Sequence, residues 1–123
     1  MDKFISEKTK TTPQINFNPD VNQLEISGES YPENSAEFYK PVLSWIKDYL
    51  KTEPDFNFNF KMIYFNTSSS KAIFDILDIL EKHFKKSGKG KINWFYESDD
   101  EDIMESGEEF AEGLTIPFEI KSY

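Results

Sequence analysis

The sequence has no cysteine, no arginine and only one histidine, and these absences exclude several kinds of site. Without cysteine there is no disulfide framework, no thiolate nucleophile and no cysteine-based zinc site. Without arginine there is no bidentate guanidinium fork to hold a phosphate or a carboxylate during catalysis. We therefore predict no cofactor and no metal-ligand set.

Long apolar runs are also absent. No stretch approaches the roughly 20 apolar residues of a membrane span, and the polar start MDKFISEKTK has no apolar core of the kind a signal peptide needs. We expect a cytoplasmic protein that does not bind membranes. At 123 residues, the chain is long enough for one domain, residues 1–123, with a single core.

Negative charge is concentrated in one segment. Nine acidic residues and no lysine lie between Glu97 and Glu112, so this segment accounts for the whole net charge of −9. Such a segment repels nucleic acid, which is bound through clustered cations. It is typical of a solvated loop and helix, and it also suits a docking surface for a basic partner, with Asp99, Asp100 and Asp102 as candidate residues. We expect it to contribute more to association than to folding.

A calcium site is a further alternative for the acidic segment. Asp100 and Asp102 have the spacing of the first two ligands of an EF-hand loop. The glycine and the distant glutamate that complete such a loop do not follow them. The pattern therefore gives a calcium site little support.

Hydrophobic periodicity predicts an α/β domain. Alternating apolar positions in 13–17 and 22–27 predict an N-terminal β-hairpin, and further strands are predicted at 55–65, 91–96 and 115–122. Helical stripes follow Ser35 and Lys71, and a short helix is expected within 99–112. Because Pro41 is tolerated only in a first turn, we expect the first helix to begin nearer Tyr39 than Ser35. The order implies a mixed sheet of about five strands with helices packed against it.

The stretch YFNTSSSK (64–71) places four hydroxyls where a central strand turns into a helix. One hydroxyl or amide there is enough to cap the helix, and Asn66, Thr67 and Ser68 are each suitable. A hydrolase nucleophile, Ser68 or Ser69, would need a base. The single histidine, His83, lies 14 residues beyond Ser69, about 21 Å along a helix. A third alternative is that a hydroxyl accepts a phosphoryl group, which the amides of a helix N-terminus accommodate.

The stretches GESYPENSAEFYKPVLSWIKDYL, YFNTSSSKAIFDIL and GEEFAEGLTIPFEI resemble the SiaC family of bacterial regulatory phosphoproteins. The resemblance implies a STAS-like domain, similar to anti-sigma factor antagonists, in which a strand-to-helix turn reading Asp-Ser-Ser is phosphorylated on its first hydroxyl. Asn66 then takes the Asp position and Thr67 the modified one, with Ser68, Ser69 and Ser70 supporting the site.

The resemblance further implies a protein kinase and a PP2C-type phosphatase acting on Thr67. It also implies an unmodified form that binds and activates a diguanylate cyclase. The function we expect is therefore that of a non-enzymatic signalling protein switched by threonine phosphorylation. The alternative is a constitutive protein-interaction domain whose hydroxyls only cap a helix.

Overall fold

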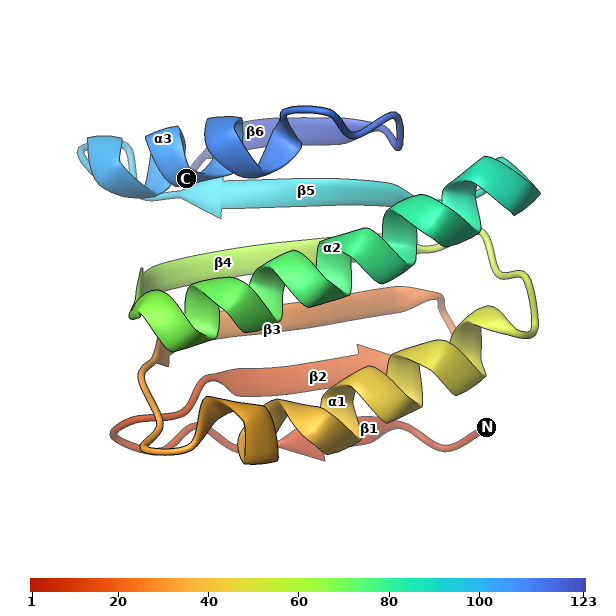
Figure 1. Cartoon of the computed structure of the whole chain (residues 1–123), viewed down its shortest axis with the longest axis horizontal. Helices are drawn as coiled ribbons and strands as arrows, with labels where there is room; N and C mark the ends of the chain where they lie inside the picture. The colour runs from red at the N-terminus through yellow and green to blue at the C-terminus, as the bar shows by residue number, and fades with distance from the viewer.

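A computed structural model describes all 123 residues and shows one six-stranded sheet with three helices (Figure 1). The sheet order follows the chain, β1-β2-β3-β4-β5-β6. The elements are β1 (Phe4–Ser6), β2 (Gln14–Asn18), β3 (Gln23–Ser30), α1 (Ser35–Leu50), β4 (Asn57–Phe65), α2 (Thr67–Ser87), β5 (Lys91–Tyr96), α3 (Glu101–Ala111) and β6 (Phe118–Ser122).

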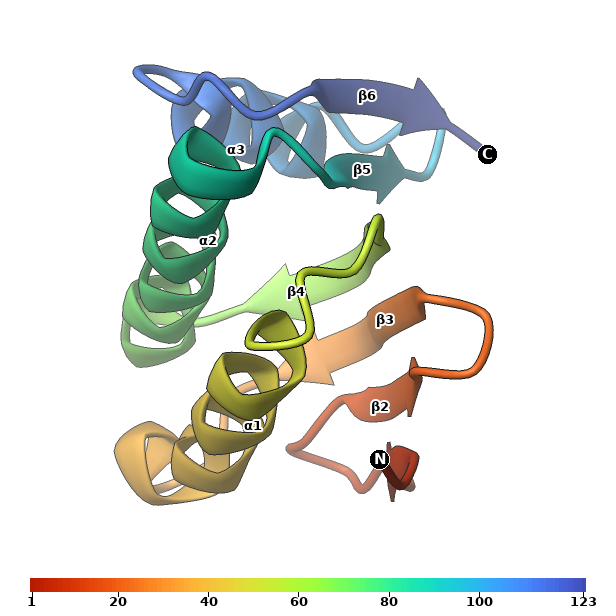
Figure 2. The same ribbon diagram turned by 90° about the vertical axis from the view of Figure 1, so that its right-hand side faces the viewer.

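The sheet is mixed. β1, β2 and β3 pair antiparallel, whereas β3, β4, β5 and β6 run parallel and are joined by the helices. Figure 2 shows all three helices on one face of the sheet, and Figure 1 shows their N-termini gathered at the edge where the parallel strands end. Each helix therefore begins at the carboxyl edge, where open α/β sheets bind ligands.

The core lies between the helices and the covered face of the sheet. Alternate strand residues point into it, including Phe58, Phe60 and Trp94, all fully buried. The opposite face is bare and carries polar side chains. One row across it, in register, is Asn16, Glu25, Asn59, Asn93 and Glu119. The domain is thus apolar on the covered side of its sheet, whereas the other side is largely polar and carries a few apolar side chains such as Ile63.

Most of the predicted elements are confirmed. The N-terminal hairpin is β2 and β3, the strand at 91–96 is β5, and the mixed α/β class is as expected. The strand count of about five was wrong, because the three residues of β1 add a sixth strand at the sheet edge. Three residues within a polar terminus carry too little alternation to predict a strand.

The predicted start of the first helix was also wrong. α1 begins at Ser35, and Pro41 lies inside it, beyond the first turn. Proline removes one backbone hydrogen bond there, but the preceding turns are held by other contacts. Asn34 caps the helix by accepting from Glu37 N at 3.0 Å, and the Tyr39 side chain is fully buried. Tertiary contacts thus overcome the local cost of the proline.

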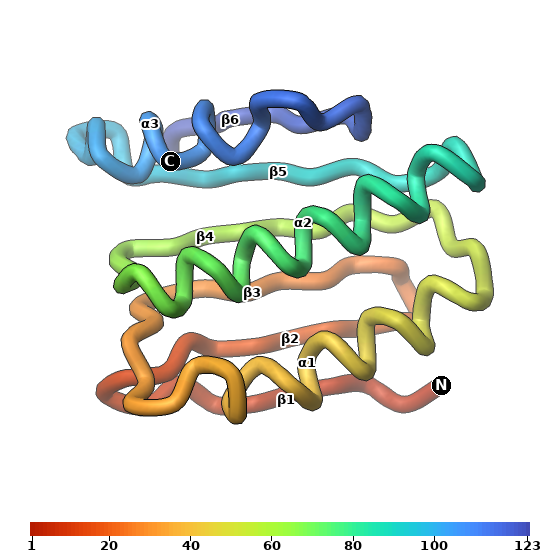
Figure 3. Tube along the Cα trace, in the orientation of Figure 1, coloured from red at the N-terminus to blue at the C-terminus, as the bar shows by residue number.

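The chain ends lie at opposite ends of the sheet, as the trace in Figure 3 shows. None of the helices is both long enough and apolar enough to span a membrane.

Candidate functional site

The turn between β4 and α2 is capped by Asn66, one of three residues that the sequence offered for this role. Its side-chain Oδ1 accepts from the backbone N–H of Ser69 at 3.0 Å, and α2 begins with Thr67. The Asn66 backbone N–H also donates to the carbonyl of Ser30, at the end of β3, at 3.1 Å. The turn is therefore held both by its own cap and by the neighbouring parallel strand.

Ser69 is fully buried and belongs to a network of hydroxyls that joins three elements. Its Oγ lies 2.8 Å from Ser30 Oγ on β3 and 3.3 Å from Ser35 Oγ on α1. Ser30 Oγ in turn lies 2.7 Å from the hydroxyl of Tyr39, also on α1. Burying four polar groups together costs little when each has a partner, but an orphaned member would be expensive.

Tyr39 stays protonated within this network. Burial raises the pKa of its phenol above 10.0, and the hydrogen bonds from Ser30 and Ser69 only partly oppose that rise. The phenol therefore remains neutral at physiological pH. The network contains no charge and no general base, so its role is to fix the start of α2 against α1 and β3.

Ser68 has one bond outside the turn and one within it. Its Oγ lies 2.9 Å from Ser35 Oγ and donates to Asn66 Oδ1 at 3.2 Å, although the residue is exposed. Neither Ser68 nor Ser69 is hydrogen-bonded to a histidine, lysine or carboxylate. The partly exposed His83 lies in the last part of α2, far along the helix from both serines. The geometry offers no base to activate a serine nucleophile.

Thr67 and Ser70 are left outside the network. Thr67 is exposed at the first position of α2, and Ser70 is half-buried one turn further on. The first turn of α2 contains no acidic residue. The free amides and positive end of the helix dipole at this turn are therefore not offset by a side-chain anion. Thr67 combines exposure with that unneutralised environment.

The second group of predicted site residues lies at the start of α3. Asp100 caps this helix by accepting from Ile103 N at 3.1 Å, while Asp99 precedes the cap and Asp102 lies in the first turn. Asp100 therefore has a structural role as the cap of α3. That the whole segment contributes more to association than to folding stays a prediction. None of the nine acids between Glu97 and Glu112 forms an ion pair with a lysine. No group of three or more acidic or histidine side chains is arranged to hold a metal.

α3 is packed closely onto the sheet through Trp94. The indole Nε1 donates to the carbonyl of Ile103 at 2.8 Å, and the ring of Phe110 lies 5.5 Å from the Trp94 ring. Gly107 faces the same indole, and a side chain at this position would overlap it. Phe110 also packs on Phe65, two residues before Thr67, with ring centroids 6.1 Å apart, so the later part of the acidic helix lies against the end of β4.

Glu81 ties the far half of α2 to the loop before β6. It accepts from the backbone N–H groups of Thr115 and Ile116, both at 2.9 Å, and from the Thr115 hydroxyl at 2.8 Å. Burial works to raise the pKa of the Glu81 carboxyl, but these donors outweigh it and hold the pKa below 4.5. This buried carboxylate fixes the position of the chain that follows α3.

The sequence did not identify Ser30, Ser35 and Tyr39 as part of the site. They come from two segments that precede the turn by more than 25 residues. The parallel pairing of β3 with β4 brings Ser30 to the turn, and the packing of α1 beside α2 brings Ser35 and Tyr39. The polar Ser30 at the end of a buried strand, just before a helix, was the one local signal of such a role.

The structure thus defines a small α/β domain with a hydroxyl-bearing turn at the carboxyl edge of its sheet. The family model for SiaC family regulatory phosphoproteins matches residues 6–123. An uncharacterised protein of Pseudomonas aeruginosa (strain UCBPP-PA14) is 34% identical over 116 residues, covering 94% of this chain and 92% of that protein. The chain belongs to the SiaC family.

Solved structures agree with this assignment. Apo-SiaC from Pseudomonas aeruginosa matches with a TM-score of 0.91 at 34% identity, covering 98% of this chain and 99% of that one. A structure of the diguanylate cyclase SiaD in complex with its activator SiaC, also from Pseudomonas aeruginosa, matches with a TM-score of 0.93 at 33% identity and the same coverage.

Proposed function

We propose that this chain is a non-enzymatic signalling protein switched by reversible phosphorylation of Thr67. In its unmodified form it binds and regulates a protein partner such as a diguanylate cyclase. A protein kinase and a PP2C-type phosphatase set the phosphorylation state. The similarity to an activator of the cyclase SiaD supports the choice of partner.

The observation that carries the proposal is that the side chains of residues 66–69 (NTSS) make different contacts. Asn66 caps the helix, and Ser68 and Ser69 bind other hydroxyls. Of these residues, only Thr67 is both exposed and outside this network, and it stands at a helix start without an acidic residue. A structural role therefore accounts for its neighbours but not for Thr67 itself.

A phosphate on Thr67 suits this environment. It would meet the free amides and the positive end of the dipole of α2, which favour an anion by about 0.3–1 kcal/mol. The modified domain should therefore stay folded. A partner that covers Thr67 would have to desolvate the phosphate, at a cost of several kcal/mol when no cation meets it. Phosphorylation is then a way to release the partner without unfolding the domain.

The first test is intact-mass measurement and phosphosite mapping of the protein from its native cells. We expect a fraction with one phosphate, on Thr67. The partner retained by the unmodified protein is then identified and titrated with both forms. We expect the phosphorylated form to bind at least roughly a hundredfold more weakly, which corresponds to about 2.7 kcal/mol.

Matched variants make this test specific. Thr67→Ala should bind constitutively, whereas Ser70→Ala, one turn away on the same helix, should leave the switch intact. Thr67→Glu should imitate release only in part, because a carboxylate carries less charge than a phosphate. A phosphate found only on a serine, or equal affinity of the two forms, would contradict the proposal and leave a constitutive interaction domain.

A further inference from the structure

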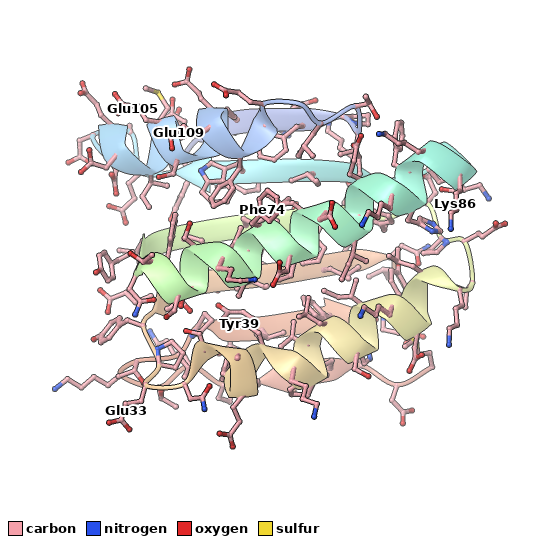
Figure 4. All side chains as sticks on the ribbon, viewed as in Figure 1. Glu33, Tyr39, Phe74, Lys86, Glu105 and Glu109 are labelled. Atoms are coloured by element: carbon pink, nitrogen blue, oxygen red, sulfur yellow. The ribbon has the colours of Figure 1, made fainter.

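Positive charge is concentrated at one end of the molecule. The segment 82–91 contains five lysines and no acidic residue. It comprises the last part of α2, the loop after it and the first residue of β5, so it lies at the edge where the parallel strands begin. Figure 4 shows Lys86 at this end, whereas Glu105 and Glu109 of α3 lie toward the other. A chain with a net charge of −9 therefore has a distinct basic region.

A hollow between the C-terminal parts of α1 and α2 is lined by lysines from both helices. It has a volume of about 270 Å³. Besides two apolar residues, its lining consists of Lys47 and Lys51 at the end of α1, and Lys82, His83 and Lys86 in the last part of α2. No carboxylate lines the hollow. It therefore gathers cations without an acid that would neutralise them.

Helix dipoles alone do not account for this group of lysines. Cations in the last turn of a helix are favourable, which applies to Lys47 and Lys86 singly. Lys82 lies before the last turn of α2, and four ammonium groups around one hollow repel one another. The arrangement therefore favours a bound anion that offsets this repulsion.

All four lysines are available to such an anion. Lys47 and Lys86 form no ion pair. Lys51 and Lys82 pair with carboxylates of their own helices at 3.2 and 2.9 Å, but the two lysine side chains are 77% and 73% exposed. Exposed pairs of this kind contribute little to stability, so a more highly charged anion can displace the carboxylate.

His83 adds a polar group without a partner. Its Nε2 is shielded from solvent and forms no hydrogen bond. Burial lowers the pKa of His83 below 6.5; Glu53 opposes this effect, and Lys86 and Lys89 add to it. Because lysine charges act on the ring, an anion bound among them would raise the pKa.

The size and charge of the hollow favour linked phosphates over a protein segment. One turn of an α-helix with its side chains occupies roughly 400 Å³, more than the volume of about 270 Å³ that the hollow offers. Linked phosphates place several negative charges within a few ångströms. A lysine ammonium binds them as a point charge, without the planar geometry of an arginine fork. Nucleic acid is disfavoured, because the chain as a whole carries a net charge of −9.

We propose that this hollow binds an oligophosphate, either free or as the phosphate chain of a nucleotide, through Lys47, Lys51, Lys82 and Lys86. Lys82 is 15 residues beyond Thr67, about 22 Å along α2, so the site is separate from the β4–α2 turn. The inference does not rest on the proposed function. An oligophosphate there joins the ends of α1 and α2, and it stabilises the folded chain because it binds only that form.

The test is calorimetric titration at low salt, without divalent cations, with inorganic tripolyphosphate and ATP as probes. Tripolyphosphate should bind at least roughly tenfold more tightly than orthophosphate and should lose affinity as salt is added. ATP binding tighter than that of tripolyphosphate would assign the site to a nucleotide, and ATP binding no tighter would assign it to free polyphosphate. No binding of either probe would overturn the proposal. A hexaglutamate peptide that binds as tightly as tripolyphosphate would overturn it in favour of an acidic protein segment.

Matched double variants locate the site. Lys47→Gln with Lys86→Gln removes the two lysines without ion pairs and should weaken tripolyphosphate binding roughly tenfold or more. Lys3→Gln with Lys10→Gln removes two exposed N-terminal lysines that also form no ion pair, and it should change the affinity less than about twofold. Both doubles should melt within a few degrees of the wild type, since the side chains are exposed. Equal weakening by the two doubles would show that only net charge matters and would contradict the assignment.

The NMR titration of His83, the only histidine of the chain, gives an independent measurement. The charged groups around its ring are Lys47, Lys51, Lys82, Lys86, Lys89 and Glu53. Saturating tripolyphosphate should raise the pKa of His83, because the phosphates offset the lysine charges. Sodium chloride at the same ionic strength is the control and should raise it less. A pKa that stays the same with tripolyphosphate bound would place the anion elsewhere and would overturn the proposed site.

Discussion

The N-termini of α2 and α3 are capped in the same way but differ in the charge of their first turns. Asn66 and Asp100 each accept from the backbone N–H three residues on, at 3.0 and 3.1 Å. The first turn of α2 then carries only hydroxyls, whereas that of α3 carries Glu101 and Asp102. One helix start already has its anions, and the other has room for an anion that can be added and removed.

The comparison also distinguishes polar side chains that are bonded within the fold from polar side chains that are free to bind other molecules. At α2 the hydroxyls of Ser68 and Ser69 are bonded to other elements, and only Thr67 is presented to solvent without such a bond. At α3 the cap is structural, and the remaining acids form no ion pair with a lysine. A short run of similar residues can therefore contain both bonded and unbonded polar side chains, and only their contacts in the structure distinguish them.

The largest expected effect concerns Glu81, which links α2 to the loop after α3. Glu81→Ala would leave the N–H groups of the exposed Thr115 and the buried Ile116 without their acceptor. An unpaired buried N–H costs about 1–3 kcal/mol and a partly solvated one less, so we expect a loss of roughly 2–4 kcal/mol. Chemical denaturation measures this loss. Glu105→Ala, on the exposed face of α3, is the control and should change stability by less than about 0.5 kcal/mol.

The same residue should give the protein a defined pH dependence. The folded pKa of Glu81 lies below that of the unfolded chain, so its contribution is complete above pH 4.5 and is lost as the pH falls through the folded pKa. Denaturation curves from neutral pH down through the acidic range should show this loss in the wild type. The corresponding part of the pH dependence should be missing from Glu81→Ala.

The next largest effect should come from the hydroxyl network under Thr67. Ser30→Ala removes the partner shared by Tyr39 and Ser69, which are both buried, and should cost about 1–3 kcal/mol. Ser106→Ala removes a single bond, from Ser106 Oγ to the Asp102 carbonyl on the exposed side of α3, and should cost less. Similar losses for the two variants would show that the two helix starts do not differ in buried polar contacts.

The two caps should be similar in strength. Asn66→Ala and Asp100→Ala are each expected to lower the free energy of unfolding by about 0.5–2 kcal/mol. Asp99→Ala, which removes an acid outside the cap, should stay within about 0.5 kcal/mol. Equal melting temperatures for Asp99→Ala and Asp100→Ala would mean that the acidic segment has no structural role.

The smallest effect isolates the helix dipoles. Thr67→Asp should stabilise α2 and Thr67→Lys should destabilise it, each by about 0.3–1 kcal/mol at low ionic strength. Glu101→Gln should destabilise α3 by a similar amount. Thermal melts at low and high salt should show all three effects decreasing with salt. An equal response to Asp and Lys at position 67 would mean that the start of α2 has no preference for an anion.

Periodicity predicted the long elements and placed the hydroxyl run at a strand-to-helix turn. Periodicity did not predict the elements whose existence or bounds depend on contacts with distant parts of the chain. β1 is three residues long and exists through pairing with β2, and α1 begins before Pro41 because Tyr39 and Ser35 are held by β3 and α2. Ser30 became part of the site only through the parallel neighbours of β4. Which hydroxyl is both exposed and without a bond to another element also could not be predicted from four adjacent, chemically similar residues.

The packing of α3 on Trp94 has a spectroscopic consequence. An indole that donates to the Ile103 carbonyl and touches Gly107 has an emission that depends on how the acidic helix sits on the sheet. The only other tryptophan, Trp45, is partly exposed on α1. In a Trp45→Phe background, emission from Trp94 alone would report any displacement of α3, so the docking of a tryptophan-free partner fragment could be followed without an attached dye.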